Sequence, residues 1–356
     1  MKTIYKILIA IVLTGMILPT NNTFAGNKDR SGEAGATELL INPWARSSGW
    51  GSVGTAYVQG LEGMFVNVAG TAFTQGTEVI FSNTTWLKGT ETNIMAFGVT
   101  QKVGESGVLG LNMMNMSFGE LNRTTEGTPD ANGGMGTFSP SLLNIGVSYA
   151  KIFSNSIYGG MQVKLVSEST DNLTASGIAI DAGIQYVTGP NDNIRFGITL
   201  RNWGTKLSFN GDGLAFRVRP PGQEDQFTLQ QRAASYELPS QMNIGVSYDF
   251  LFNENHTLTA AANFRSNAFT NDQFTAGLQY KLMSYLMLRA AYTFEPGIMD
   301  EIDSGNKFTV DNGLSAGASV EIPLNKESGT VFAVDYAFRS TAHFNNTHSI
   351  GARISF

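Results

Sequence analysis

Fourteen short stretches in which apolar residues alternate with polar or small ones restrict the folds open to this chain more than any other feature. In one of them, even positions 194 to 200 carry Ile, Phe, Ile and Leu, whereas odd positions 195 to 201 carry Arg, Gly, Thr and Arg. Successive side chains of a β-strand point to opposite faces, so each stretch has an apolar and a polar face. About ten residues with this alternation are typical of strands in membrane β-barrels, and an even number of strands closes an antiparallel barrel. The stretches begin near residues 77, 91, 107, 141, 156, 176, 193, 241, 256, 271, 284, 312, 329 and 345.

The connections between these stretches sort by length onto two sides of the predicted sheet. If the first strand runs outward, the inner connections are all short, namely 104–107, 154–156, 188–192, 252–255, 282–284 and 324–328. The outer side holds the long loops 119–140, 203–240 and 295–311. This asymmetry is known from outer-membrane barrels, whereas a secreted β-sandwich has no reason to show it. We therefore predict an all-β fold, a 14-stranded antiparallel transmembrane β-barrel at residues 77–356.

Composition agrees with a barrel and excludes several other classes of protein. Only 15% of the residues are charged, against roughly 25% in an ordinary soluble domain. The 23 Phe, 11 Tyr and 4 Trp residues exclude intrinsic disorder, because they supply too much apolar surface for burial. The absence of cysteine excludes disulfides and thiolate metal sites. The formal net charge of −6 argues against nucleic acid as a partner.

The N-terminal residues have the build of an export signal. Two lysines within the first six residues precede an apolar run from 7 to 18, which is followed by Thr23-Phe24-Ala25. A basic start, a short apolar run and a small-x-small site are typical of a secretory signal peptide. An anchoring helix is the alternative, but the run is too short to span a bilayer comfortably. We predict that residues 1–25 are removed after Ala25, and that the mature chain lies in the lipid bilayer of the outer membrane of a Gram-negative bacterium.

A barrel of fourteen strands has more lumen than its own side chains fill, so we expect a plug. Residues 26–36 are polar, and we predict that they form a mobile leader. Residues 37–76 are dense in Gly and Ala, which lets backbone pack closely against backbone, and we predict that they form the plug. Within them, residues 49–54 have the G-x-G-x-x-G spacing of a dinucleotide-binding loop. Neither a preceding strand nor a following amphipathic helix accompanies this motif, so close packing is the better interpretation.

The same N-terminal segment resembles a known family in the order of its residues. That order is apolar-Pro-x-Ala-Arg, Gly-x-Gly, small-Ala and finally Asn-x-Ala-Gly before the first strand. It resembles the PorV/PorQ family, outer-membrane proteins of the type IX secretion system with a FadL-like fourteen-stranded barrel and an N-terminal hatch. Trp50 stands where the family usually has Met, and Val68 replaces its usual Pro. The resemblance rests on Asn42, Pro43, Arg46, Gly49, Gly51, Gly54, Ala56, Asn67, Ala69 and Gly70.

The resemblance implies a function in protein secretion. We accordingly expect an accessory barrel that captures or shuttles exported proteins with a C-terminal secretion domain, working with a large outer-membrane translocon protein. A FadL-like barrel also implies an alternative, the transport of hydrophobic small molecules, which predicts an apolar pocket below the loops and a lateral opening or strand kink. A plain attachment scaffold is a third hypothesis.

The long outer loops carry the candidate binding residues. Solvated loops rarely hold as many apolar groups as 203–240 does, and aromatic residues interspersed with Arg are typical of interfaces. An equally strong interpretation is that this loop folds back over the barrel mouth and buries its own aromatic side chains. The candidates are Trp203, Phe209, Phe216, Phe227 and Tyr236, with Met299 and Ile302 in the loop 295–311.

No set of residues indicates catalysis, and we expect neither enzyme activity nor a cofactor or metal. The three histidines, His256, His343 and His348, fall at opposite ends of the predicted barrel. A hydrolase would need a positioned serine and carboxylate, and no local serine motif is present. The acidic stretch 300–305 lacks the spacing of a calcium-binding EF-hand loop.

Overall fold

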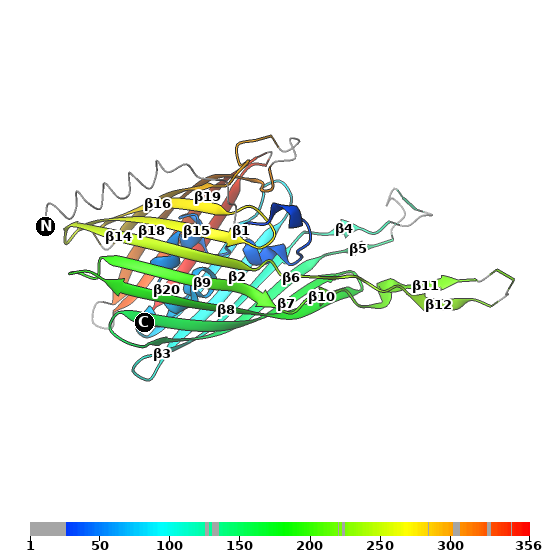
Figure 1. The fold of residues 1–356 in the computed structure, drawn as a ribbon, viewed down its shortest axis with the longest axis horizontal. Coiled ribbons are helices and arrows are strands. Elements are labelled where there is room, and N and C mark those ends of the chain that lie inside the picture. Colours follow the sequence, from blue (N-terminus) through cyan, green and yellow to red (C-terminus); the bar gives the residue numbers. More distant parts are fainter. Residues whose placement is uncertain are drawn as a thin grey trace.

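The strands of the chain close into a single antiparallel barrel in the computed structural model (Figure 1). The structure describes residues 26–124, 128–129, 135–219, 221–222, 225–283, 285–301, 307–325, 329–342 and 344–356, so the predicted signal peptide lies outside it. Within these ranges the barrel has fourteen strands, and β1 pairs with β20 to close it. Each strand begins within three residues of its predicted start, and the predicted fold class is confirmed. The strands are β1 (Thr77–Thr85), β2 (Asn93–Val103), β3 (Gly107–Ser117), β6 (Ser141–Ile152), β7 (Ile157–Thr170), β8 (Leu173–Thr188), β9 (Ile194–Gly204), β14 (Gln241–Asn253), β15 (His256–Asn267), β16 (Gln273–Leu282), β17 (Leu286–Phe294), β18 (Asp311–Asn325), β19 (Thr330–Thr341) and β20 (Thr347–Ser355).

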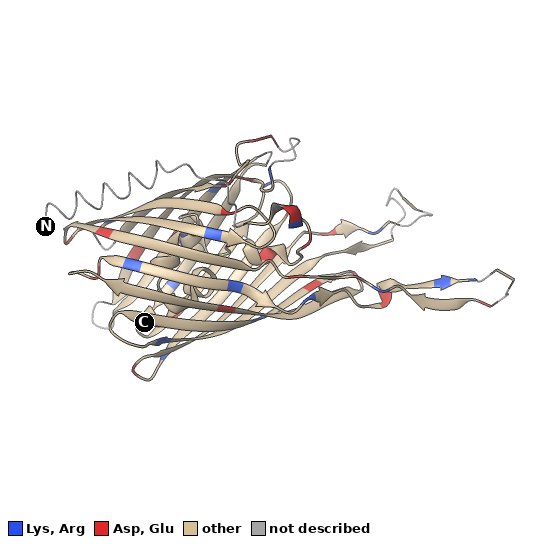
Figure 2. Ribbon diagram, in the orientation of Figure 1, with Lys and Arg blue, Asp and Glu red and all other residues tan. Residues whose placement is uncertain are grey.

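The two faces of the wall differ as the alternation requires. In β9 the side chains of Phe196, Ile198 and Leu200 are about half exposed, whereas Thr199 between them is buried. Large apolar side chains pointing away from the lumen are stable only against lipid, because water would be ordered around them. Figure 2 shows the strands mostly tan, with few charged positions. None of the helices among the described residues is long and apolar enough to cross a bilayer.

Residues 28–73 form short helical turns that lie inside the ring of strands or at its outer end (Figure 1, blue). Trp44, Val53 and Leu61 are completely buried between these turns and the wall. One apolar cluster joins Trp44 and Leu61 to Ile80 and Ala96 of the first two strands. The hydrophobic core of the protein is therefore the contact between plug and barrel. The turns are η1 (Lys28–Arg30), η2 (Thr37–Leu40), α2 (Ala45–Ser48), η3 (Gly54–Ala56), α3 (Gly63–Val66) and η4 (Val68–Phe73).

Several charged side chains that face the lumen form ion pairs with one another. Lys164 of β7 and Asp181 of β8 form an ion pair of 2.8 Å, and both are almost completely buried. Arg353 of β20 pairs with Glu321 of β18, and Arg46 of α2 lies 3.9 Å from the same carboxylate. Because an unpaired charge in a buried lumen is strongly unfavourable, these pairs fix which strand and plug segments lie together.

The wall contains a β-bulge between β8 and β9. Asp181 faces two residues of β9, Arg201 and Asn202, and the pairing then resumes with Ile180 opposite Trp203. Asn202 has a φ of 59°, its backbone nitrogen donates to Asp181 Oδ1 at 2.7 Å, and its side chain accepts a hydrogen bond from Lys164 Nζ. The extra residue turns Trp203 outward. The predicted loop 203–240 therefore starts too early, because the alternation rule cannot anticipate an inserted residue.

Three small two-stranded sheets extend the barrel at its outer end (Figure 1). The predicted loop 119–140 contains one of them, and the predicted loop 203–240 contains the other two, of which β11–β12 reaches farthest from the barrel. These loops therefore contain β-structure, which the sequence analysis did not predict. The pairs are β4 (Leu121–Asn122) with β5 (Thr137–Phe138), β10 (Leu207–Ser208) with β13 (Ser235–Tyr236), and β11 (Ala215–Val218) with β12 (Phe227–Gln230), and η5 (Asp212–Leu214) precedes β11.

Candidate functional site

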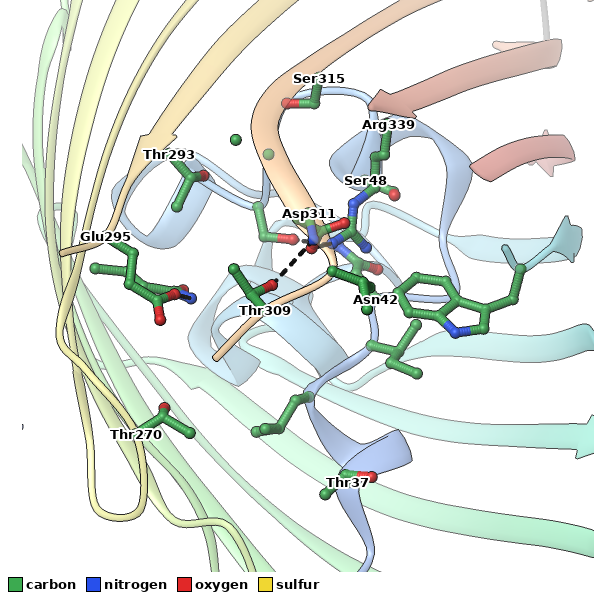
Figure 3. Close-up of a pocket in the computed structure, with 18 of the residues that line it drawn as sticks. Thr37, Asn42, Ser48, Thr270, Thr293, Glu295, Thr309, Asp311, Ser315 and Arg339 are labelled. Atoms are coloured by element: carbon green, nitrogen blue, oxygen red, sulfur yellow. Dashed lines mark hydrogen bonds and ion pairs between the residues drawn. The ribbon is translucent and has the colours of Figure 1, made fainter. Parts of the chain in front are cut away.

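The outer end of the barrel encloses a cavity of about 500 Å³ between the plug and the wall. Figure 3 shows Thr293 and Glu295 on one side, and Asp311 and Arg339 near Asn42 of the plug on the other. Apolar groups contribute to the lining as well, among them Trp86, Met116, Phe118, Ile298 and Phe308. The cavity is therefore amphipathic and opens where the outer loops begin.

The charged side chains of this cavity are already engaged with partners in the wall. Arg339 forms an ion pair with Asp311, and its guanidinium lies 5.3 Å from the ring centre of Trp86. Arg265 donates to Gln273 Oε1 at 2.8 Å, and Gln273 in turn donates to Glu295 at 2.7 Å. Among the described residues, no group of His, Asp and Glu side chains could hold a metal ion. The cavity is suited to holding a polar or amphipathic group.

The first part of the plug motif organises the turn before α2. The side-chain amide of Asn42 donates to Ser47 Oγ at 2.9 Å and to Ser52 Oγ at 2.8 Å, and its Oδ1 accepts from the backbone of Trp44 at 3.0 Å. Pro43 lies inside this loop, where it fixes the extended chain ahead of the turn. Arg46 then points from α2 toward Glu321.

The structure gives a physical reason for two of the three glycines in the G-x-G-x-x-G sequence. A Cβ on Gly49 would lie 2.8 Å from the Cα of Gly317 in β18. Gly51 has a φ of 59°, a backbone conformation that residues other than glycine rarely adopt. A Cβ on Gly54 would meet only ordinary contacts at 3.8 Å. The sequence interpretation as close packing therefore agrees with the geometry of Gly49, backbone conformation explains Gly51, and nothing in the contacts requires glycine at 54.

The second part of the motif connects the plug to β8. Asn67 is buried, caps η4 by accepting from the backbone of Ala69 at 3.2 Å, and donates to the carbonyl oxygens of Thr55 and Ile184 at 2.8 and 3.1 Å. A Cβ on Gly70 would lie 2.3 Å from the carbonyl oxygen of Val58. Asn67 therefore fastens the plug to β8, whereas Gly70 permits close packing within the plug. Ala56 packs closely against the wall, because its Cα would lie 2.8 Å from a Cβ on Gly197.

Sequence reasoning missed two buried acids of the plug, Glu62 and Glu38, of which the one with an unpaired carboxylate oxygen among the described residues is Glu38. Its Oε1 accepts from Asn144 of β6 at a long 3.4 Å, and its Oε2 has no hydrogen-bond partner among the described residues. Burial raises the pKa of Glu38 to about 7, and the nearby carboxylate of Glu168 adds to the shift. The available signal was an acidic residue directly before the apolar run Leu39-Leu40-Ile41.

The pKa of Glu38 predicts that the seating of the plug depends on pH. Because the folded pKa lies above the ordinary 4.5, the contribution is fully present below about pH 4.5 and is lost as the pH rises through about 7. The full difference corresponds to about 3 kcal/mol. We expect the denaturant midpoint of the protein in detergent to fall between pH 5.5 and 8.5. The fall is expected to be smaller in Glu38→Gln, where Glu62, whose pKa burial also raises to about 7, still loses its proton in this range. An equal fall in both proteins would contradict this prediction.

The loop candidates Phe209 and Tyr236 lie at the base of the long outer loop, next to the plug. Both pack against a buried cluster that contains Ala36 of the leader, Leu39 of the plug and Leu207. Tyr236 Oη donates to Glu168 at the end of β7. Leu207 is completely buried, so this part of the loop, which we call the root (residues 205–209 and 235–238), folds onto the barrel mouth.

The candidates Phe216 and Phe227 lie on β11 and β12, beyond the root. The cross-strand register pairs Phe216 with Leu229 and Val218 with Phe227, so these four side chains share one face. Phe216, Phe227 and Leu229 are each nearly half exposed. The opposite face carries Ala215, Arg217, Thr228 and Gln230. We call this amphipathic hairpin the arm (described residues 211–219, 221–222 and 225–232). The root therefore folds back over the barrel mouth, whereas the arm leaves Phe216 and Phe227 exposed, and its role as a binding surface stays a prediction.

The remaining loop candidates are not brought together with these. Trp203 is exposed on the outer face of β9, and Met299 is the most exposed large apolar side chain of the described residues, in the connection after β17. Ile302 lies outside the described residues, as does His343. His256 and His348 each contact a tyrosine, Tyr280 and Tyr336, at opposite ends of the barrel.

Comparison with solved structures supports the fold. The chain is similar to the toluene transporter TodX of Pseudomonas putida, with a TM-score of 0.56 and 14% identity over 88% of this chain and 98% of that one. It is also similar to the monoaromatic hydrocarbon channel CymD (TM-score 0.53, 13% identity, 89% and 98% coverage). A third relative in structure is the toluene transporter TbuX of Ralstonia pickettii (TM-score 0.53, 13% identity, 88% and 97% coverage). At these identities the likeness establishes the fold alone.

Comparison of sequences identifies the family. Among curated proteins none matches this sequence. A family model described as type IX secretion system membrane protein PorP/SprF matches residues 128–338, more than half of the chain. The resemblance of the plug segment pointed to this secretion system, which is confirmed, and to its PorV/PorQ members, which is not. None of the descriptions of family or structural relatives names an enzyme. The chain therefore belongs to the type IX secretion system membrane protein PorP/SprF family.

Proposed function

We propose that this protein is an accessory barrel of type IX secretion that uses its arm to capture exported proteins carrying a C-terminal secretion domain, next to a large translocon protein. This is the kind of function that the PorV/PorQ resemblance implies. The observation that supports it is the arm, whose four apolar side chains share one face and cover no other described part of the protein. Apolar surface of this kind is typical of interaction sites.

The physical form of the arm favours a β-rich partner. A hairpin of two strands is marginally stable on its own, and its outer edges carry unpaired backbone groups. A partner strand that pairs with one edge and covers the apolar face satisfies both needs, as in recognition by β-augmentation. The root fixes the direction of the arm, because it is packed on the plug and on β7 and β8.

Transport of hydrophobic small molecules is the second candidate function. A lateral groove of about 520 Å³ at the outer rim is lined by Phe118, Leu142, Phe209 and Tyr236, and such a groove could hold an apolar molecule. The bulge between β8 and β9 is the strand irregularity that this hypothesis expects. The lumen below is filled by the plug, however, and the bulge itself is closed by Asn202 hydrogen bonds to Asp181 and Pro239.

Two variants of the arm test the proposed function against this alternative. Phe216→Ser with Phe227→Ser removes the apolar face, and Arg217→Ser with Thr228→Ser changes the opposite face of the same hairpin. Tagged mature proteins are recovered from their own outer membrane in mild detergent, and bound proteins and lipids are identified by mass spectrometry. Each buried Phe contributes about 1.5–3 kcal/mol, so we expect the apolar-face variant to lose partners ~tenfold or more.

The control variant is expected to retain the same partners as the unmodified protein. Recovery of exported proteins that share a C-terminal domain, or of a very large outer-membrane protein, supports the secretion function. Equal recovery by both variants contradicts the role of the apolar face. A barrel that is recovered alone with bound fatty acid or hydrocarbon contradicts the proposed function and favours transport.

A further inference from the structure

The leader, residues 26–36, lies along the outer mouth and is held at two places. At one end, Gly26 contacts the connection between β15 and β16. At the other end, Gly35 donates to the backbone carbonyl of Glu237 at 3.0 Å, and Ala36 donates to Glu168 Oε1 at 3.1 Å. The prediction of a mobile leader is therefore not supported by its contacts. The leader connects the root of the arm to a distant part of the rim and borders the lateral groove.

Between these ends Arg30 strengthens both attachments. Its guanidinium lies 4.3 Å from the ring centre of Phe269, which is buried beside the β15–β16 connection. The same group forms ion pairs with Glu33 at 2.7 Å and with Glu237 of the root at 3.2 Å. Lys206 and Arg30 lower the pKa of the Glu237 carboxyl by hydrogen bonding to it.

Asp272 and the backbone around it form a tight binding site for the nitrogen of Gly26. Its nitrogen donates to Asp272 Oδ2 at 2.8 Å, and Asp272 is 7% exposed. The other carboxylate oxygen of Asp272 accepts from the backbone of Asn267 at 3.4 Å. A Cβ on Gly26 would lie 2.7 Å from the backbone nitrogen of Asp272 and 2.7 Å from the carbonyl oxygen of Thr270. Only glycine fits this position without displacing backbone.

Removal of the signal peptide would supply a positive counter-charge for the Asp272 carboxylate. Among the side chains that the structure describes, no Lys, Arg or His forms an ion pair with Asp272. Hydrolysis of the bond between Ala25 and Gly26 adds water. The hydroxyl goes to the Ala25 carbonyl carbon, which leaves as a carboxylate, and the Gly26 nitrogen becomes an ammonium. A buried carboxylate is stable when a cation pairs with it, and charged donors make the strongest hydrogen bonds.

We propose that removal of residues 1–25 creates an α-ammonium on Gly26 that Asp272 binds, and that this ion pair fastens the leader across the outer mouth. Removal of the signal peptide thereby completes the attachment of the leader across the outer mouth. The register is strict, because one additional residue before Gly26 shifts the amine by about 3.5 Å. The inference concerns the mature chain itself and does not depend on the partner of the arm.

The test measures how fast the N-terminal amine reacts in the mature protein. The protein is purified from its own outer membrane in mild detergent and treated at neutral pH with an amine-acylating reagent, and mass spectrometry follows the N-terminal peptide. Pairing with a carboxylate favours the protonated, unreactive amine. Asp272→Asn removes this pairing and is expected to accelerate acylation ~tenfold, which corresponds to a ~tenfold larger fraction of unprotonated amine. Asp225→Asn on the exposed arm is the matched control and leaves the rate unchanged. Lys206, which is 62% exposed, reports that the reagent reaches the rim equally in all proteins.

A second variant keeps the test decisive if Asp272→Asn does not assemble. Gly26→Ala leaves the carboxylate in place but introduces the Cβ that the site has no room for, and it is expected to accelerate acylation of the amine by a similar factor. Equal rates in the unmodified protein and both variants would overturn the proposal. So would an N-terminal peptide that begins at a residue other than Gly26.

Discussion

Substituting Gly197 by valine is expected to displace the plug and open the barrel to solutes. A Cβ at this position of β9 would lie 2.2 Å from the carbonyl oxygen of Thr55 and 2.8 Å from the Cα of Ala56. Both atoms belong to the plug backbone, which cannot move aside as a flexible side chain can. Overpacking of this kind costs about 1–3 kcal/mol, which raises the population of displaced plugs by roughly ten- to a hundredfold.

The measurement is the uptake of a large hydrophilic antibiotic by whole cells, together with single-channel conductance of the purified barrel. Ala276→Val is the matched control, because Ala276 lies on the outer face of β16 and the added methyl groups meet lipid. We expect the control to behave as the unmodified protein. If Gly197→Val assembles with unchanged conductance and uptake, the plug does not depend on this backbone contact.

Removing the lysine of the ion pair beside the bulge is expected to cause the largest loss of stability. Lys164 and Asp181 have side chains that are 8% and 3% exposed and lie 2.8 Å apart. Lys164→Met leaves the Asp181 carboxylate buried without its counter-charge and removes a donor to Asn202. Breaking a buried pair on one side costs about 3–5 kcal/mol.

The free energy of unfolding in detergent, obtained from denaturant titration, measures this loss. The double variant Lys164→Met with Asp181→Leu is expected to recover most of it, because no unpaired charge then remains. Lys206→Met provides a matched control on an exposed ion pair with Glu237, which is worth at most about 1 kcal/mol. Similar losses in Lys164→Met and Lys206→Met would show that the bulge is not held by its buried charges.

The bulge, the plug and the root of the arm form one connected region at the outer end of the barrel. Asn202 in the bulge donates to the carbonyl oxygen of Pro239, which follows the root. The root contacts Ala36 of the leader and Leu39 of the plug. A partner that pulls on the arm therefore acts on the same contacts that hold the leader and the start of the plug. For the proposed secretion function, this connection is a physical route from the arm to the lumen.

Local pattern was sufficient for the barrel wall. The alternation of side chains follows from the geometry of each strand alone, so the number of strands and their approximate starts could be read without knowing any partner strand. The density of Gly and Ala in residues 37–76 likewise indicated a closely packed segment, because close approach of backbones needs small residues wherever it occurs. The apolar and aromatic content of residues 203–240 marked that loop as unusual, but local pattern could not divide it into root and arm.

The tertiary structure decided every feature that depends on residues far apart in the chain. The hydrogen bonds from Gly26 to Asp272 and from Ala36 to Glu168 tie down a leader that by composition alone looks mobile. The bulge that turns Trp203 outward arises from one extra residue opposite Asp181, and no periodicity contains it. The sequence by itself determined a fourteen-stranded barrel with an internal plug, because strand alternation and glycine density are local properties. Which charges pair, which aromatics are buried and where the leader is fastened depend on the closure of the barrel, which brings distant strands and the plug together.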